Sequence, residues 1–271
     1  LVMVLPPSAE AAGPALPREA TFIVDTSGSM SGVSIVQAKE ATAFAISRLK
    51  PGDRFNVIEF NSHARSLFPA PMPADPATIA AAQRFVAGLR ANGGTEMKPA
   101  LTAALAPESL PGYARQVFFL TDGAVGNENE LLKLIRANLG DRRLYTIAIG
   151  PAPNAWFIRK AAQFGRGTAT FIGDVRDVRE RMTALFEKLE RPTLTDLSVT
   201  WPVGAEVYPQ QLPDLYSGEP IVVTASFAGA PTTLSIVGRR GKSAWGTLLP
   251  TGAGPAANGI GVLWARERIS A

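Results

Sequence analysis

From residue 21 to about residue 190, short apolar runs alternate with longer segments in which apolar residues recur at helical spacing. The runs are almost uninterrupted in apolar residues, which is typical of strands buried on both faces of a parallel sheet. The pattern predicts an α/β fold with a doubly wound, Rossmann-like, mostly parallel sheet flanked by helices. The predicted strands are Phe22–Asp25, Phe55–Phe60, Val117–Thr121, Leu144–Ile149 and Thr168–Ile172, with Arg65–Phe68 as an antiparallel edge strand.

Turn residues mark the ends of the predicted helices. An apolar stripe that begins at Ile35 stops at Pro51-Gly52, and Gly140 and Gly165 follow the ends of two later helices. Asp174 is the expected N-cap of the last one. The predicted helices are Ile35–Leu49, Ile79–Leu89, Lys98–Leu105, Glu128–Leu139, Ala155–Phe164 and Asp174–Glu190.

After Pro192 the pattern becomes that of a smaller β-rich C-terminal module. Alternating apolar residues over Leu194–Trp201, and the runs Ile221–Phe227 and Thr232–Val237, predict strands separated by Pro and Gly. Leu1–Leu5 can add an edge strand to this module. A helix is expected to begin near Val262, and Leu249-Pro250-Thr251-Gly252 is interpreted as a turn.

The predicted domain organisation has three parts. Residues 1–18 are a connector or edge strand from an upstream domain, residues 19–192 are the α/β domain, and residues 193–271 are the β-rich module, with its end cut short. Because the first residue is not Met, we expect the chain to be a piece of a longer one.

Composition excludes several classes of function. No apolar run approaches the roughly 20 residues that span a bilayer, so we expect no membrane insertion. The net charge is +4, but the basic residues are scattered, which disfavours nucleic-acid binding. With no cysteine and only one histidine, His63, the chain cannot form disulfides, and a zinc site is disfavoured.

Short oxygen-bearing side chains follow two predicted strands and also occupy a loop between two predicted helices. The three stretches are Asp25-Thr26-Ser27-Gly28-Ser29, Asn92-Gly93-Gly94-Thr95 and Thr121-Asp122-Gly123. Since ligands bind beyond the carboxyl ends of parallel strands, we expect these loops to meet. The candidate ligands are two carboxylates and three hydroxyls, without nitrogen or sulfur, which suits Mg²⁺ or Mn²⁺: Asp25, Asp122, Ser27, Ser29 and Thr95.

Other interpretations of these residues are available. Each stretch alone is typical of an N-cap, a loop or a turn. Asp25 at a strand end can also be the nucleophile of a Mg²⁺-dependent phosphotransferase, although such enzymes want a second aspartate two residues on, where this chain has Ser27. Gly241-Lys242-Ser243 resembles the end of a phosphate-binding loop, but the required upstream glycine position is Ile236. We therefore predict no catalytic or nucleotide-binding residues.

Asp25, Ser27 and Ser29, with Thr95 and Asp122, resemble the metal-ion-dependent adhesion site (MIDAS) of the von Willebrand factor A-type (VWA) domain. Thr121–Glu128, Ile149–Asn154 and Gly165–Thr168 further resemble bacterial relatives of the inter-alpha-trypsin inhibitor heavy chains. In such proteins a β-rich VIT domain precedes the VWA domain.

The resemblance implies a non-enzymatic binding and adhesion module. Ser27, Ser29 and Thr95 would hold Mg²⁺ or Mn²⁺ directly, while Asp25 and Asp122 would hold it partly through water. A partner protein's Asp or Glu carboxylate would complete the coordination shell. The resemblance implies a bacterial cell-envelope or secreted protein, and the alternative is a cytoplasmic scaffold of an ATPase or chelatase assembly.

Overall fold

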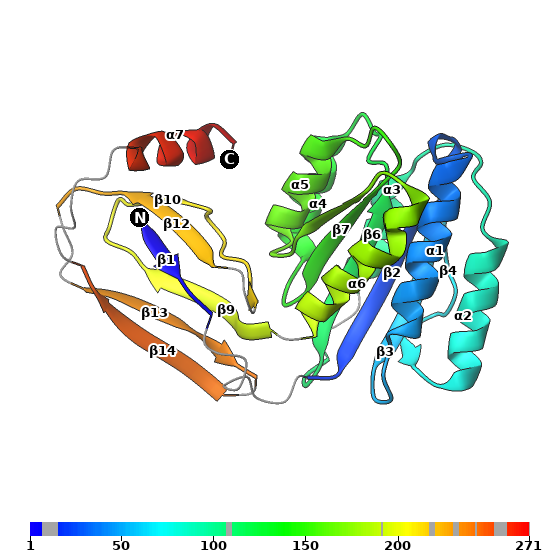
Figure 1. Ribbon diagram of the computed structural model, residues 1–271, viewed down its shortest axis with the longest axis horizontal. Helices are drawn as coiled ribbons and strands as arrows, with labels where there is room; N and C mark the ends of the chain where they lie inside the picture. Colours follow the sequence, from blue (N-terminus) through cyan, green and yellow to red (C-terminus); the bar gives the residue numbers. More distant parts are fainter. Residues whose placement is uncertain are drawn as a thin grey trace. The chain divides into compact units, whose positions relative to one another are not determined.

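The computed structural model describes residues 1–6, 16–106, 110–190, 192–216, 220–229, 233–241, 243–251 and 259–270. The chain divides into two compact units. The larger unit is Leu16–Glu187, and the smaller one combines Leu1–Ala15 with Lys188–Ala271. Figure 1 labels the elements of both units.

The larger unit is built on a seven-stranded sheet with the order β4-β3-β2-β6-β7-β8, in which β5 also pairs with β3. All neighbours from β3 to β8 run parallel, and β4 and β5 are antiparallel to β3. The predicted doubly wound α/β fold is therefore confirmed. The strands are β2 (Arg18–Asp25), β3 (Arg54–Phe60), β4 (Ala64–Ser66), β5 (Met72–Pro73), β6 (Ala114–Thr121), β7 (Arg143–Ile149) and β8 (Ala169–Ile172).

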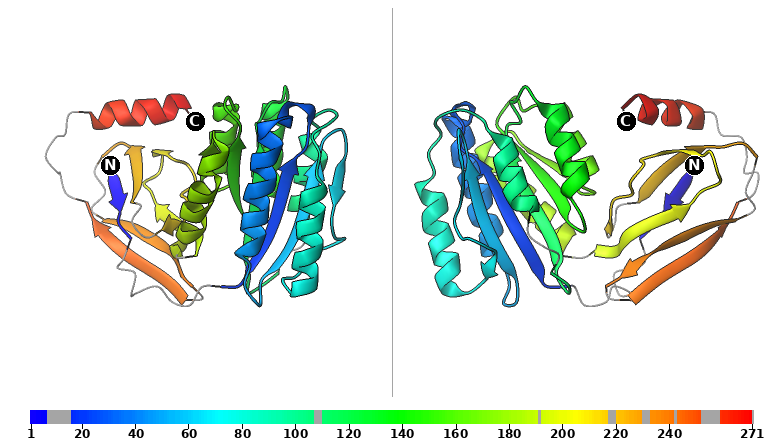
Figure 2. Two further views of the ribbon diagram at one scale, coloured as in Figure 1. Left: turned by 45° about the vertical axis from the view of Figure 1, so that its right-hand side comes forward. Right: turned by 180° about the vertical axis from the view of Figure 1, so that it is seen from behind.

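Helices cover both faces of this sheet. In Figures 1 and 2, α1, α2 and α6 lie on one face, and α3, α4 and α5 lie on the other. The helix predicted over Asp174–Glu190 begins later, at Val178 of α6. Asp174 instead caps a 3-10 turn (Val175–Asp177) by accepting the backbone N–H of Arg176. The helices are α1 (Val33–Ser47), α2 (Pro76–Gly88), α3 (Met97–Leu105), α4 (Glu128–Asn138), α5 (Ala155–Phe164) and α6 (Val178–Leu189).

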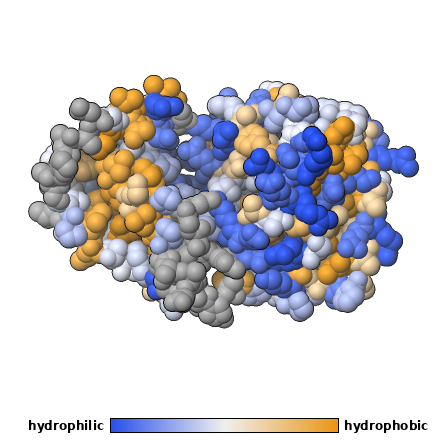
Figure 3. Space-filling view, viewed as in Figure 1, coloured by the Kyte–Doolittle hydropathy of each residue, from blue (hydrophilic) through white to orange (hydrophobic). Residues whose placement is uncertain are grey.

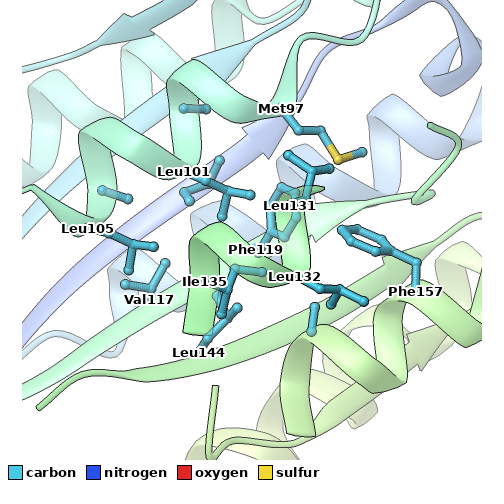
Figure 4. Close-up of a cluster of buried hydrophobic side chains, with 14 of the residues drawn as sticks. Met97, Leu101, Leu105, Val117, Phe119, Leu131, Leu132, Ile135, Leu144 and Phe157 are labelled. Carbon is cyan, nitrogen blue, oxygen red and sulfur yellow. The ribbon is translucent and has the colours of Figure 1, made fainter. Parts of the chain in front are cut away.

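Two adjacent phenylalanines of β6 reach opposite faces of the sheet, as the two-residue period of a strand requires. Phe119 points into the cluster with Leu101 and Phe157 that Figure 4 shows between the sheet and α3–α5. Phe118 stacks in the other direction on Phe22 and Phe186, with ring centroids 5.1 and 5.3 Å apart. Burying each such ring contributes roughly 1.5–3 kcal/mol, so both layers of helices stabilise the sheet.

Strand register aligns the carboxyl ends of the central strands. Val24 pairs with Leu120, and Asp25 pairs with Phe60. Asp25 and Thr121 therefore end their strands side by side. The loops that follow β2 and β6 start from one edge of the sheet, which is where the sequence predicts a site.

The smaller unit contains two antiparallel sheets, with the orders β1-β12-β10 and β11-β9-β13-β14. Apolar residues from both sheets form one core, including Val4, Val223 and Ile236. The expected edge strand near the N-terminus is β1, in which Val2 pairs with Val223. The elements are β1 (Val2–Val4), β9 (Pro192–Thr200), β10 (Glu206–Tyr208), β11 (Leu215–Tyr216), β12 (Ile221–Ser226), β13 (Thr233–Arg240), β14 (Ser243–Pro250) and α7 (Ile260–Ser270).

One prediction in this unit is wrong. Leu249 and Pro250, interpreted as part of a turn, are the last two residues of β14. The chain turns earlier, at Gly241, whose φ of +57° favours glycine. Lys242 and Gly252 lie outside the described residues.

The helices in the described ranges are too short or too polar to cross a bilayer.

Candidate metal centre

Asp25 is the last residue of β2 and has no exposed surface. Its Oδ1 accepts the backbone N–H of Ser27 at 2.8 Å, and its Oδ2 accepts the hydroxyl of Thr121 at 2.6 Å. Burial raises the pKa of Asp25 above its usual value, hydrogen bonds from Ser27 and Thr121 oppose that rise, and the nearby charge of Asp122 adds to it. A buried carboxylate of this kind gains from a compensating positive charge.

Ser27 and Ser29 bring two hydroxyl groups together beside Asp25. Ser27 is buried and Ser29 is exposed, and their Oγ atoms lie 3.1 Å apart. That separation suits a hydrogen bond, and it also suits two neighbouring ligands of an octahedral ion, since bonds of ~2.1 Å place such ligands about 3.0 Å apart. The short 3-10 turn Gly28–Met30 holds both side chains in place before α1 begins.

Backbone hydrogen bonds hold the loop of Thr95 against the loop of Asp25. The N–H of Gly28 donates to the carbonyl of Gly93 at 3.1 Å, and the N–H of Asn92 donates to the carbonyl of Thr26 at 2.8 Å. A Cβ at Gly28 would lie only 3.2 Å from the Gly93 oxygen, so a larger residue would push the two loops apart. Thr95, which is half-buried, follows two residues after this contact.

Asp122 follows β6 and is half-buried. Its Oδ1 accepts the N–H of Ala124 at 3.0 Å, and its carbonyl accepts the N–H of Asn154 at 2.8 Å, just before α5. The charge of Asp122 raises the pKa of Asp25, so the two carboxylates interact electrostatically. Each predicted loop therefore lies at the same edge of the sheet.

Several supporting residues were not predicted. Thr121 holds the Asp25 carboxylate, and strand register contained the signal for it, since parallel strands that pair in step end side by side. Asn61 bridges the first two loops, because its amide donates to Asn92 Oδ1 at 2.9 Å and to Thr26 Oγ1 at 3.4 Å. Ser62 Oγ accepts the N–H of Gly94 at 2.8 Å. No motif pointed to Asn61 or Ser62.

Residues 19–171 match the family model of the von Willebrand factor type A domain. The chain belongs to this family. It is 30% identical over 217 residues to a von Willebrand factor A domain-containing protein of Dictyostelium discoideum, covering 79% of this chain and 23% of that protein. It is also 30% identical over 223 residues to human inter-alpha-trypsin inhibitor heavy chain H4, covering 77% of this chain and 24% of the relative. The chain thus spans about a quarter of the length of these curated relatives.

Solved structures agree with the VWA fold. A von Willebrand factor type A protein from Catenulispora acidiphila superposes with a TM-score of 0.68 at 25% identity, covering 89% of this chain and 66% of that one. Proximal thread matrix protein 1 from the mussel byssus, in a structure described as having a zinc-occupied MIDAS motif, superposes with a TM-score of 0.51. Its 13% identity, over 70% of this chain and 50% of that one, shows a shared fold alone.

The donor atoms of this VWA domain fit a hard cation. The candidate ligands are carboxylate and hydroxyl oxygens, which Mg²⁺ and Mn²⁺ prefer. In the described parts of the chain, no three His, Cys, Asp or Glu side chains gather as they do in many zinc sites. The candidate site instead combines two carboxylates with the hydroxyl groups of Ser and Thr. Among these groups, the buried carboxylate of Asp25 gains most from a bound cation.

Proposed function

We propose that this VWA domain is a protein-binding and adhesion module whose contact with its partner depends on a bound Mg²⁺ or Mn²⁺. VWA domains are typically adhesion or protein-interaction modules. The observation that carries the proposal is the meeting of three oxygen-rich loops beside the buried carboxylate of Asp25.

In this proposal Ser27, Ser29 and Thr95 hold the ion through their hydroxyl groups. Asp25 and Asp122 hold it partly through water and balance its charge. The hydrogen bonds from Ser27 N–H and Thr121 to Asp25 fix the carboxylate in one orientation, so these residues position it. The ion supplies a positive centre that an anionic group of another molecule can approach.

The partner we propose is a protein that presents an Asp or Glu carboxylate. A carboxylate oxygen is a good ligand for Mg²⁺, and a single such side chain can fix the register of an interface. The zinc in the mussel protein's MIDAS motif supports ion binding by the fold, and the oxygen-only donors of this chain are the reason for proposing Mg²⁺ or Mn²⁺ instead. The likeness to inter-alpha-trypsin inhibitor heavy chains is the basis for proposing a cell-envelope or secreted location.

The geometry around Asp25 argues against the phosphotransferase alternative. That reaction needs an acid/base carboxylate two residues after the nucleophile. At that position Ser27 donates its N–H to Asp25, and its hydroxyl contacts Ser29. We therefore propose a binding module without catalytic residues.

Calorimetry of Mg²⁺ and Mn²⁺ binding tests the proposal. We expect one ion per chain, and at least a tenfold weaker affinity in Asp25→Ala, since loss of a charged ligand removes more than ~1.4 kcal/mol. Glu180→Gln, which removes an exposed carboxylate on α6, is the matched control and should bind normally. Acetate, as a probe of the partner carboxylate, should bind only when the ion is present. Absence of ion uptake, or uptake unchanged in Asp25→Ala, would reject the proposed site.

A further inference from the structure

The terminal strands of the sheets in the described residues are short, with one exception. The central sheet ends in β4 and β8, which have three and four residues. In the smaller unit, β1 and β10 have three residues each and β11 has two. The exception is β14, which has eight residues. A short edge strand prevents unwanted strand pairing, and the eight-residue β14 lacks this protection.

β14 also lacks the other features that protect an edge. Its residues, Ser243–Pro250, include no charged side chain, and Pro250 is its only proline, at the strand end. It pairs with β13 residue for residue, from Thr233↔Pro250 to Arg240↔Ser243, without a bulge. Within the described parts of the chain, no strand pairs with its other side. That side presents a regular row of backbone N–H and C=O groups.

Apolar side chains accompany this row of backbone groups. Leu248 is 68% exposed on the outward face of β14. On the inward face, Trp245 and Leu249 pack against the core of the unit and remain partly exposed. Figure 3 shows hydrophobic residues gathered on the visible face of this unit. A strand added to β14 would satisfy the backbone groups and cover these side chains together.

We propose that β14 pairs with β14 of a second copy of this chain, in antiparallel orientation about a two-fold axis. Directly opposite residues of a sheet share a face, so the inward residues of one copy must meet inward residues of the other. Any axis that passes through a residue of β14 meets this condition, and an axis at Thr247 also places the two partly exposed apolar residues opposite one another, Trp245 of one copy against Leu249 of the other, twice. The strand has no charge to repel its own copy or to select a different partner.

Sedimentation equilibrium of the whole chain tests this pairing. We expect the mass to rise with concentration from 28.6 kDa towards twice that value. Leu248→Lys should remain a monomer, because a charge on an edge strand opposes pairing. Val237→Lys is the matched control, since Val237 is 48% exposed on β13 beside the edge, and it should still dimerise. A far-UV circular-dichroism spectrum that matches the wild type establishes that each variant is folded.

Cross-linking tests the register independently, because the chain has no native cysteine. Thr247→Cys places one thiol from each copy at the two-fold axis, so mild oxidation should give a disulfide-linked dimer. Val237→Cys should give little cross-link. A wild-type monomer throughout the micromolar range would overturn the proposal and would leave a strand from another molecule as the occupant. A dimer that Leu248→Lys leaves intact, or equal cross-linking of both cysteine variants, would also overturn it.

Discussion

Asp25 is a carboxylate without exposed surface, and its burial couples the stability of the metal-free protein to pH. Burial raises its pKa above the usual value of 3.8, so the folded state binds this proton more tightly than the unfolded chain does. The contribution of Asp25 to stability is therefore fully present below pH 3.8 and is lost as the pH rises through the raised pKa.

Asp25→Asn, which cannot ionise, should remove this pH dependence. In chelator, we expect the free energy of unfolding of the Asn variant, relative to wild type, to rise as the pH increases from about 4 to neutrality. Urea denaturation at a series of pH values measures the difference, and Glu180→Gln provides the control for loss of an exposed carboxylate. A difference that stays constant with pH would contradict the argument. Added Mg²⁺ should lower the free energy of unfolding of the Asn variant relative to wild type, since the ion stabilises only the wild type.

At the residue scale, the sequence predicted the candidate ligands, whose side chains carry the oxygen atoms that a hard cation binds. It missed the supporting residues, whose roles depend on contacts between loops. Asp25, Ser27 and Ser29 were identified because a motif places carboxylate and hydroxyl oxygens after an apolar run. Thr121 and Asn61 were missed because their importance lies in hydrogen bonds to other loops, at 2.6 Å to Asp25 and 2.9 Å to Asn92. Such bonds depend on which strands are neighbours, which a linear pattern does not state. The metal-binding roles themselves stay a prediction.

At the scale of elements, a buried ion pair joins the start of β2 to the turn before β3. Asp53 accepts the backbone N–H of Arg18 at 2.8 Å and its Nη2 at 2.8 Å, and also accepts the N–H of Lys50 at 2.9 Å. Both members of the pair are buried. Removing one partner leaves a buried charge and several unsatisfied donors, which is far more costly than losing an exposed pair.

Asp53→Ala should therefore lower the free energy of unfolding by about 3–5 kcal/mol. Arg18 and Asp25 lie at opposite ends of β2, so ion affinity in the folded protein should stay within about twofold of wild type. Denaturant unfolding and calorimetry measure the two quantities. Asp174→Ala is the matched control, because Asp174 pairs with the exposed Arg176 at 2.7 Å and caps a short 3-10 turn, so its loss should lower stability by much less than the loss of Asp53. A small effect of Asp53→Ala would show that the pair contributes little.

Element prediction succeeded where burial alone determines the pattern. β7 was predicted within one residue because all seven of its residues are buried. β14 was missed because Leu249 and Pro250 were interpreted as part of a turn, and because the residues Ser243–Leu248 show no clear apolar alternation. β14 forms instead because the turn at Gly241 returns the chain along β13. β5 has two residues, one of them Pro73, and gave no signal.

At the scale of the whole molecule, residues far apart in sequence share the smaller core, while the larger unit has cores of its own. Val2 pairs with Val223 and Val4 pairs with Ile221, so the first strand of the chain completes a sheet formed by residues after 200. The proposed ion-binding residues all belong to the larger unit. Stability of one unit and ion binding by the other should therefore respond to different changes.

Calorimetric unfolding should resolve two transitions that can be shifted separately. Mg²⁺ at 100 times its Kd should raise the larger unit's free energy of unfolding by about 2.7 kcal/mol, because only the folded state binds it. Val223→Asp buries a carboxylate in the core of the smaller unit. It should lower only the free energy of unfolding of the smaller unit, by several kcal/mol. Chelator should leave both transitions present, since the apolar strands are buried independently of the ion-binding loops. A single transition that responds to both Mg²⁺ and Val223→Asp would mean that the two units unfold together. Ion binding and the small core would then contribute to one cooperative free energy of unfolding.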